Sequence, residues 1–461
     1  MATTTTGEPP PATDRPLPSP SRRRQPALLR QMLVQPQPVL DELAAELGPV
    51  FALGAGPLRM VVLGEPSVVH QLLAMPTSAF RWGHPFNVIG FVTGPTSVIV
   101  SDGADWKRRR SPVQAAFSRR RLNRWIPTIL QQTDDAIDAL VADLDGGTRE
   151  MDLYPIGRRL VLGIVVRTLF GSRMGERADE IGDLMQRPQD YLESPGIRQI
   201  PHPFPHTARA RVKADRVAFD RLIDEQIALR RRDPSGDPLD VLEALVAESD
   251  LTDAEIRDQV VTLIGAGYDT TAASLAWILR RIPLVPGLLD RLRAEADAVL
   301  GPIGDGPAPD EGTLARLDLA ERSMRETLRL HPAGSISPRQ AAEDVDVAGY
   351  HIRKGTMILW SPYLAGRDPS AWDDPLAFDP DRFVDLTAEQ AAIADQAWVP
   401  FGRGPRACIG FALAQIELTL ILSRIAQRLD LTPVSTEVPE PRGMVVNRPT
   451  GGAPLGVAAR P

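Results

Sequence analysis

The chain has 461 residues and a mass of 50.3 kDa, and it carries a formal net charge of -7. Its 43% hydrophobic and 24% charged residues are ordinary for a soluble globular protein, and its acidic balance argues against a nucleic-acid partner. No run approaches the roughly 18 apolar residues of a membrane span, and the first residues lack the apolar core of a secretory signal. A single cysteine excludes an internal disulfide and favours a reducing, cytoplasmic location.

Residues 1–25 are rich in threonine, proline and serine, which predicts a disordered tail. The remainder, residues 26–461, is predicted to form one domain. Its first half is mostly helical by apolar spacing, with two short β runs at Val50–Leu53 and Met60–Leu63. Helices are expected at Pro38–Leu47, Ser67–Leu73, Trp106–Phe117, Asp134–Asp143, Arg158–Phe170, Val212–Arg232 and Pro238–Glu248.

Two stretches of this half read as irregular. The segment Phe80–Val100 is apolar but broken by turn residues, so it is either a mobile loop over an apolar cavity or a buried core segment. Prolines and glycine between Arg187 and His206 predict no regular structure. The prolines at 203 and 205 also forbid the helix through which His202 and His206 could bind a metal.

A long helix without proline is predicted from Leu251 to Ile282. Thr252 and Glu255 have the spacing of a capping box at its start. Its middle reads G-A-G-Y-D-T-T over residues 265–271, although glycine costs about 1 kcal/mol against alanine inside a helix. Small residues there permit close helix packing, or they let a flat molecule approach the backbone. Packing alone does not account for the acid, Asp269.

The remaining chain predicts further helices and a few short strands. Helices are expected at Leu288–Leu300, Leu314–Leu330 and Ile409–Leu429, and strands at Val345–Val347, His351–Ile352 and Met357–Trp360. Glu326 and Arg329 lie one helical turn apart, as in an ion pair. The predicted fold class is therefore mostly α with small β-sheets (α+β).

The only cysteine, Cys408, lies in the run F-G-R-G-P-R-A-C-I-G at Phe401–Gly410. Glycines and a proline hold this run out of helix and strand, and a helix follows it. Unpaired N–H groups and the helix dipole at that helix start favour a thiolate. The sequence therefore predicts a site that holds sulfur as an anion.

Three chemistries compete for this site. A dinucleotide enzyme is rejected because neither Gly54-Ala-Gly56 nor Gly402-Arg-Gly404 completes the G-x-G-x-x-G pattern. A hydrolase with Cys408 as nucleophile needs a catalytic base, and none of the six histidines has a motif context. The third possibility is a haem-thiolate protein.

The chain resembles soluble, bacterial-type members of the cytochrome P-450 superfamily, which are haem-thiolate proteins. Phe401–Gly410 matches the family's F-x-x-G-x-R-x-C-x-G loop, and Ala266–Thr271 matches its central-helix motif. Four further motifs follow the family's order: W-x-x-x-R at Trp106–Arg110, E-x-x-R at Glu326–Arg329, an arginine strand entry at Arg339, and F-x-P-x-R-F at Phe378–Phe383. The resemblance implies a triangular, helix-rich domain with haem between the long helix and the cysteine loop.

By this resemblance the cofactor is haem b (iron protoporphyrin IX), and Cys408 is the axial ligand of its iron. Ten residues would contact the cofactor: Cys408, Trp106, Arg110, Ala266, Gly267, Arg339, Phe401, Gly402, Arg406 and Gly410. Trp106 and the arginines would hold the propionates. Glu326, Arg329 and Arg382 would form a buried structural network.

On the opposite haem face the resemblance makes Thr270 and Asp269 catalytic, with Thr270 supplying a hydrogen bond and Asp269 relaying protons from solvent. This pair indicates a monooxygenase that uses O2, and hydroxylation or epoxidation is the expected reaction. The pair argues against a haem-thiolate protein with non-oxygenase chemistry, since such members often lack it, but that chemistry stays an alternative.

The resemblance also implies partners and a substrate pocket. Electrons would come from a separate ferredoxin and ferredoxin reductase, docked on basic residues that include Lys107, Arg108, Arg109 and Arg403. The pocket residues would be Phe86, Ile89, Phe91, Leu263, Ser335, Ile336, Met444 and Val445. Because they are mostly apolar, we expect a hydrophobic substrate such as a terpenoid, fatty acid or polyketide, and a role in secondary-metabolite biosynthesis.

Overall fold

The computed structural model describes residues 15–83, 87–199, 201–202, 204–234, 240–302 and 309–460. Its α-helices of eight residues or more are α1 Gln25–Met32, α2 Pro36–Leu47, α3 Pro66–Ala74, α5 Gly103–Ala116, α6 Arg119–Leu144, α7 Leu153–Gly175, α8 Ala178–Leu192, α10 Ala208–Arg232, α11 Val241–Glu248, α12 Asp253–Arg281, α13 Leu288–Leu300, α15 Asp318–Leu330, α17 Ala388–Ala397 and α18 Phe411–Arg428. The shorter ones are α4 Val88–Thr93, α9 Gly196–Gln199, α14 Glu311–Leu314 and α16 Pro362–Ala365.

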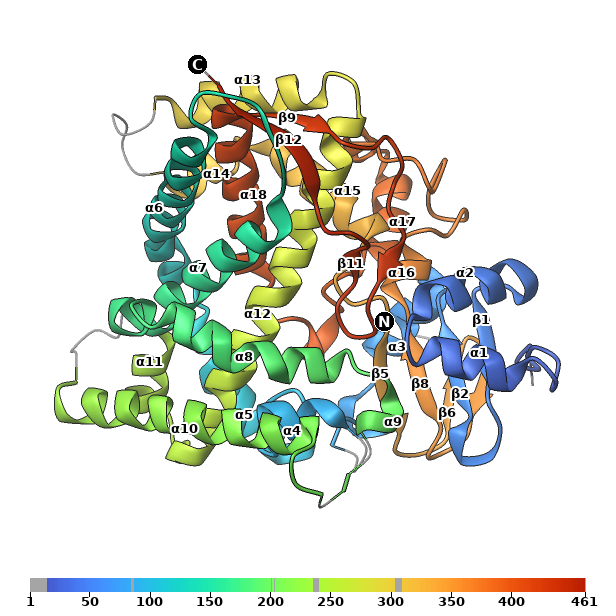
Figure 1. The fold of residues 1–461 in the computed structure, drawn as a ribbon. Helices are drawn as coiled ribbons and strands as arrows, with labels where there is room; N and C mark the ends of the chain where they lie inside the picture. The colour runs from blue at the N-terminus through green and yellow to red at the C-terminus, as the bar shows by residue number, and fades with distance from the viewer. Residues whose placement is uncertain are drawn as a thin grey trace, which may run out of the picture.

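The strands are short. They are β1 Val50–Leu53, β2 Met60–Leu63, β3 Phe80–Arg81, β4 Arg149–Asp152, β5 Ser337–Ala341, β6 Val345–Val347, β7 Tyr350–Ile352, β8 Met357–Trp360, β9 Leu429–Pro433, β10 Pro441–Arg442, β11 Arg448–Pro449 and β12 Pro454–Ala459. Helices form the larger part of the molecule, and the largest sheet stands to one side of them (Figure 1). The prediction of a mostly α protein with small sheets is confirmed.

Helix α12 runs through the centre of the helical part (Figure 1). Most of its residues are buried, and α7, α15, α18 and β11 pack against it. At its start Thr252 accepts a hydrogen bond from the Glu255 backbone N–H (3.3 Å), and Glu255 accepts one from that of Thr252 (3.0 Å). This is the predicted capping box, and it fixes where the central helix begins.

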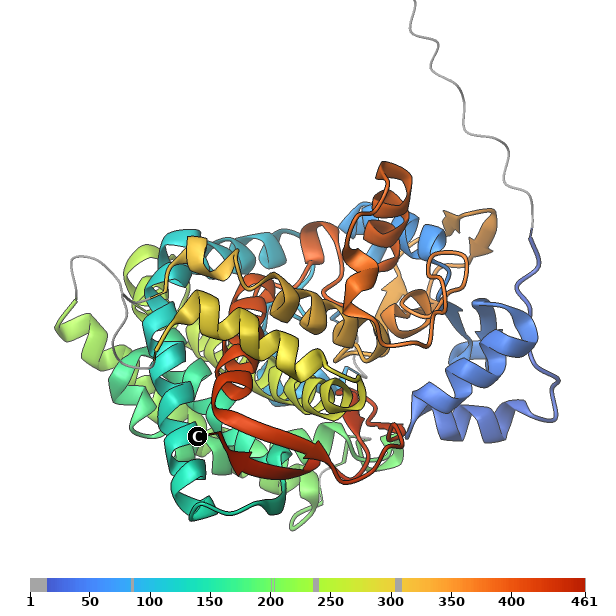
Figure 2. The same ribbon diagram turned by 90° about the horizontal axis from the view of Figure 1, so that it is seen from above.

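The largest sheet has the strand order β1-β2-β8-β5-β3. Strands β1 and β2 pair antiparallel, with Val50 opposite Leu63, whereas β2 and β8 are parallel, with Met60 opposite Met357. Helices α1 and α2 cover this sheet on the side away from the helical part (Figures 1 and 2). Strand β5 therefore brings residues near 337 to the edge of the helical part.

Three segments differ from the sequence prediction. Helix α6 is one helix of 26 residues that begins at Arg119, not a short one at Asp134. Helix α8 continues through Pro188 to Leu192, because one lost backbone hydrogen bond is outweighed by burial of side chains such as Met185 and Tyr191. The segment Phe80–Val100 contains the short helix α4, whose start is capped by the side chain of Asn87.

Residues 1–14 of the predicted tail lie outside the described residues. The following residues bind two sheets. The Arg15 N–H donates to the carbonyl of Gly349, in the turn between β6 and β7 (3.1 Å), and the N–H of Ala52, on β1 of the large sheet, donates to the Pro18 carbonyl (2.8 Å). Among the described helices, no single one has both the length and the apolar composition to cross a membrane. Helices α12 and α13 meet those criteria only together, across a bend of 114°.

Candidate active site

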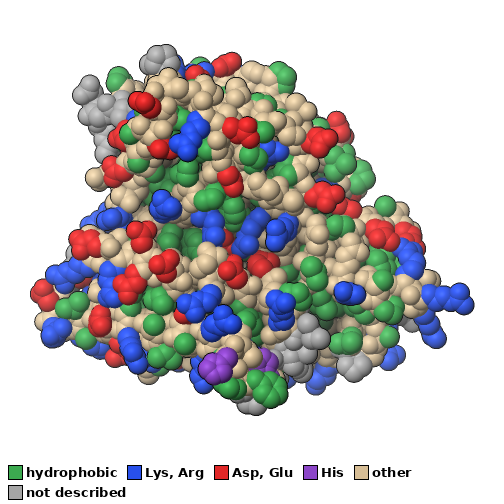
Figure 3. All heavy atoms as spheres, in the orientation of Figure 1, with side chains coloured by type: hydrophobic (Ala, Val, Ile, Leu, Met, Phe, Trp, Pro, Cys, Tyr) green, Lys and Arg blue, Asp and Glu red, His purple; other side chains and the backbone are tan. Residues whose placement is uncertain are grey.

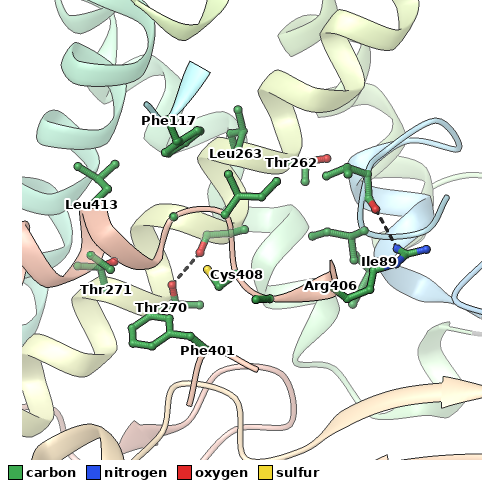
Figure 4. A pocket seen from close by; sticks show the side chains of 18 of the residues that line it. Ile89, Phe117, Thr262, Leu263, Thr270, Thr271, Phe401, Arg406, Cys408 and Leu413 are labelled. Carbon is green, nitrogen blue, oxygen red and sulfur yellow. Dashed lines mark hydrogen bonds between the residues drawn. The ribbon is translucent and has the colours of Figure 1, made fainter. Parts of the chain in front are cut away.

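A cavity of about 320 Å³ lies between α12 and the loop that carries Cys408 (Figure 4). Ten of the predicted site residues line it: Ile89, Arg110, Leu263, Ala266, Gly267, Thr270, Phe401, Arg406, Cys408 and Gly410. Most of the other described lining side chains are apolar. The fold thus brings together residues that are up to 321 positions apart in the sequence, since Ile89 and Gly410 meet at one cavity.

The loop before α18 presents the sulfur of Cys408 to this cavity. The Cys408 backbone N–H donates to the Phe401 carbonyl (2.9 Å), which closes the loop. Gly404 has a φ of +69°, and a Cβ atom there would lie 2.8 Å from the Leu73 carbonyl oxygen. Only glycine fits such a position without strain. Gly402 also has a positive φ, but its nearest neighbour is the ring of Trp360, outside the cavity lining.

The electrostatics of Cys408 differ from the simple expectation of a helix-stabilised thiolate. Burial raises the pKa of the Cys408 thiol, while the backbone N–H groups of Gly410 and Phe411 and the charge of Arg110 lower it, and the net shift is upward. The surrounding protein alone therefore favours the thiol. A metal cation bound to the sulfur would favour the anion.

Three arginines and two tryptophans converge on one side of the loop. Arg406 stacks on Trp82 and Trp106, and Arg339 lies over Phe80 and Trp82. Burial lowers the pKa of Arg339 to about 10, and burial together with the charges of Arg110 and Arg339 lowers that of Arg406 to about 9. Asp102, 3.4 Å from Arg406, compensates that cation in part, whereas burial is the cause of the lowered pKa of Arg339.

Buried polar atoms in this group also lack partners. The Nε1 of Trp106 and the Nε atoms of Arg339 and Arg406 have no hydrogen-bond partner among the described residues. A bound group with two carboxylates beside the thiol would satisfy both the charges and these donors, as the propionates of a haem do. The residues present therefore fit a haem.

Thr270 faces the cavity from α12, and its hydroxyl donates to the Ala266 carbonyl (2.7 Å), as the dashed line in Figure 4 shows. Asp269, the next residue toward the N-terminus, does not face this cavity. It is 1% exposed, is absent from the cavity lining, and forms ion pairs with Arg448 and Arg158. The acid and the alcohol thus lie side by side in sequence but on different sides of the helix.

A sequence model of the family described as Cytochrome P-450 matches residues 18–453. The chain belongs to the cytochrome P-450 family. This P-450 is 35% identical over 368 residues to cytochrome P-450 139 of Mycobacterium tuberculosis, which covers 76% of this chain and 80% of that protein. It is 32% identical over 414 residues to the pentalenene oxygenase of Streptomyces avermitilis, which covers 87% and 88% of the two chains.

Its fold is that of solved P-450 structures. Retinoic acid bound cyanobacterial CYP120A1 superimposes with a TM-score of 0.78 at 22% identity, over 91% of this chain and 94% of the other. Family membership makes the protein an oxidoreductase of the monooxygenase class with a haem-iron cofactor, and it implies redox partners and a hydrophobic substrate.

The predicted substrate-pocket residues separate into groups. Ile89 and Leu263 line the cavity, and Phe86 lies outside the described residues. Phe91 packs under Arg209 and against Tyr191, and Ser335 bonds to Gln37 behind β5. The described cavity lining includes Ser337 and Pro338 instead of Ser335 and Ile336, and Ile336 packs into the core around the large sheet.

Met444 and Val445 also lie away from the described lining of the cavity. Their backbone N–H groups donate to the carboxylate of Glu193, at 2.7 and 3.3 Å. They belong to the loop between β10 and β11. This loop is thereby fixed to the C-terminal end of α8.

Glu326, Arg329 and Arg382 form one network. Arg329 donates twice to Glu326 (2.8 Å each), and the Nε of Arg382 donates to the same carboxylate (2.9 Å). The Glu326 and Arg329 side chains are fully buried. Arg329 also donates to the carbonyls of Gly366, Pro375 and Ala377, so the network fixes the loop that precedes Phe378.

The predicted basic surface is partly neutralised within the protein. Arg108 and Arg109 both bind Glu255, and Arg403 pairs with Asp395 (2.7 Å). Arg406 points into the cavity wall, where it donates to the Ser101 carbonyl (2.6 Å). Lys107 remains at the rim of a surface hollow of about 600 Å³, beside Trp106 and Pro405 of the ligand loop.

The sequence reasoning missed two charged residues near the site. Glu417, on α18, lines the cavity, and its Oε1 has no partner among the described residues. Its position nine residues after Cys408, in the helix that follows the ligand loop, could have indicated it. Arg448, which binds Asp269, has no local motif and is 179 residues away in sequence. Elsewhere in the described chain no three His, Cys, Asp or Glu side chains cluster as a metal site.

Proposed function

We propose that this P-450 inserts one atom of O2 into an apolar organic substrate by hydroxylation or epoxidation. The observation that supports this most is that Cys408, Arg406 and Thr270 line a single cavity, with unsatisfied Nε donors on Arg339 and Arg406. The cofactor would be haem b, whose iron, when bound, supplies the activation of O2.

Each residue then has a defined task. Cys408 would ligate the iron, and Gly410 leaves room beside it, because a Cβ atom there would meet nothing within 4 Å. Trp106, Arg339 and Arg406 would bind the propionates, while Arg110 also donates to the Ala407 carbonyl (2.7 Å) and so positions the ligand loop. On α12, Ala266 and Gly267 keep the cavity open. Thr270 and Asp269 would carry protons toward it.

The cavity wall favours a substrate with few polar groups. Ile89, Val98, Ile99 and Leu263 line it, and no Asp, Lys or His is among the described lining residues. The related pentalenene oxygenase is named after a hydrocarbon. We therefore propose a terpenoid substrate and a role in secondary-metabolite biosynthesis. Fatty acids and polyketides, also predicted from the sequence, are the alternatives that a substrate screen would separate from a terpenoid.

Electron transfer would use a ferredoxin and its reductase, docked on the face that carries Lys107. The cytoplasmic location stays a prediction. A cysteine hydrolase is disfavoured, because burial raises the pKa of the Cys408 thiol and no histidine is among the described lining residues.

A carbon monoxide difference spectrum of the reduced holoprotein tests the haem-thiolate assignment. We expect the red-shifted Soret band of thiolate ligation in the wild type and its loss in Cys408→Ser. Turnover should be lost with it. Ser337→Ala, at the same cavity but not a ligand, is the control and should keep the band. A Soret band without the red shift, or one that survives in Cys408→Ser, would disprove the assignment.

A further inference from the structure

Asp269 is held between two arginines that come from different parts of the fold. Its carboxylate binds Arg448 of β11 on one side, and the Nε of Arg158, on α7, lies 3.5 Å away on the other. Tyr154 and Tyr268 complete its charged and titratable surroundings. Burial and the charge of Asp269 raise the pKa of Tyr268 to about 12 and also raise that of Tyr154, so both phenols stay neutral.

Arg158 and Tyr268 also reach a second, solvent-facing hollow. This hollow of about 450 Å³ lies along α7 and α8, and its lining includes Arg158, Tyr268 and Gln186. Figure 3 shows lysine and arginine side chains gathered across the middle of this face, with acidic side chains among them. Asp269 therefore lies between water on one side of α12 and the cavity of Thr270 on the other.

Arg448 belongs to the hairpin of β10 and β11, and Glu193 binds the loop of this hairpin. This glutamate directly follows α8 and accepts the N–H groups of Met444, Val445 and Val446 (2.7, 3.3 and 2.8 Å). Gly443 is required there, since its φ is +114° and a Cβ atom would lie 2.1 Å from the Val446 carbonyl oxygen. The Glu193 carboxylate lies 3.8 Å from Arg448.

Two carboxylates thus face one guanidinium. Asp269 binds Arg448 directly, and Glu193 is the alternative partner. If Arg448 turns toward Glu193, Asp269 loses its strongest tether and is free to rotate about the helix surface. The position of the α8 end and of the hairpin then determines how firmly Asp269 is held.

We propose that Arg448 is a positioning residue that holds Asp269 toward the hollow lined by Arg158 and Tyr268, and that Glu193 couples this hold to the contact between α8 and the hairpin. In this arrangement Asp269 exchanges protons with water in the hollow on its own side of α12, and water would carry them on to the hydroxyl of Thr270 at the cavity. The inference rests on the proton-relay role of Asp269 proposed above.

The test is a double-mutant cycle of Arg448→Met and Asp269→Asn in the holoprotein. Oxygen consumption is measured in H2O and D2O, with a surrogate plant ferredoxin, its reductase and pentalenene as the probe. Arg448→Met should slow consumption about tenfold, the order expected for one lost charge-assisted hydrogen bond, and should raise the solvent isotope effect. Added to Asp269→Asn, it should have no further effect, because Arg448 acts only through Asp269.

Matched variants separate this role from folding. Arg442→Met, on the exposed strand β10 of the same hairpin, should behave as the wild type, and Arg448→Lys, which keeps the charge, should recover part of the rate. If Arg448→Met does not fold, the cycle is run with Arg448→Lys. A second measurement needs no turnover: Glu193→Gln should speed amide hydrogen exchange at residues 444–446 about tenfold.

The outcomes distinguish the two proposals. If Asp269→Asn slows consumption but Arg448→Met does not, or if their effects add, the positioning role is wrong while the relay role of Asp269 stands. If Asp269→Asn itself changes neither the rate nor the isotope effect, both are wrong. Unchanged exchange at residues 444–446 in Glu193→Gln would refute the coupling to the hairpin.

Discussion

Single buried carboxylates of this protein differ in what surrounds them. Asp269, away from the haem cavity, has two arginines within ion-pair distance, whereas the Oε1 of Glu417, which lines the cavity, has no hydrogen-bond partner among the described residues. Burial raises the pKa of Glu417 from 4.5 to about 8. At neutral pH the Glu417 side chain is therefore a neutral acid.

This shift predicts how stability depends on pH. The folded protein keeps the Glu417 proton that the unfolded chain releases above pH 4.5, so this group lowers the free energy of unfolding as pH rises from 4.5 toward about 8. We expect Glu417→Gln to flatten that decline, which amounts to at most about 1.4 kcal/mol per pH unit. Urea unfolding of the holoprotein at several pH values measures how the free energy of unfolding changes with pH. Glu150→Gln, on exposed β4, is the control, and an unchanged slope in Glu417→Gln would contradict the assignment.

At the scale of elements, the sequence predicted what local pattern controls. The capping box gave the start of α12, and the strands β1, β2, β6 and β8 have the predicted bounds. Local rules failed where tertiary packing decides, as at Pro188, which lies inside α8. The same limit applies to the site. The motif residues Cys408 and Thr270 were identifiable, but which side of α12 Asp269 faces depends on Arg448, a contact without any sequence signal.

Glu255, the capping-box residue of α12, also joins this helix to α5, because Arg108 and Arg109 of α5 bind its carboxylate. The hydrogen bond from Arg108 is the main cause that lowers the pKa of Glu255 to about 2. Thr252→Ala should lower the free energy of unfolding by about 1 kcal/mol, since an N-cap hydroxyl is lost. Thermal unfolding measures this. Thr252→Ser keeps the hydroxyl and should stay near the wild type; an equal loss in both variants would show that the cap is not the cause.

At the scale of the whole molecule, the haem cavity is enclosed by segments that are held in place from outside it. Between α16 and α17, before the ligand loop, the chain is largely irregular, and the network of Glu326, Arg329 and Arg382 anchors this part to α15. On the opposite side, Glu193 fixes the β10–β11 hairpin to α8. Buried ionic anchors thus replace regular secondary structure where the chain must stay irregular near the cofactor.

The Glu326 network should therefore contribute far more than an exposed pair on the same segment. Glu326→Gln leaves two buried guanidiniums uncompensated, and removing one partner of a buried pair costs about 3–5 kcal/mol. Arg291→Gln breaks the exposed pair with Asp381 (2.8 Å) and should cost less than about 1 kcal/mol. Urea unfolding of the holoproteins, followed by circular dichroism and by the Soret band, compares the two. Glu326→Gln should also lower haem retention, because the anchored part of the chain leads through α17 to the Cys408 loop. Equal stability losses in the two variants would mean that the network is not the anchor proposed here.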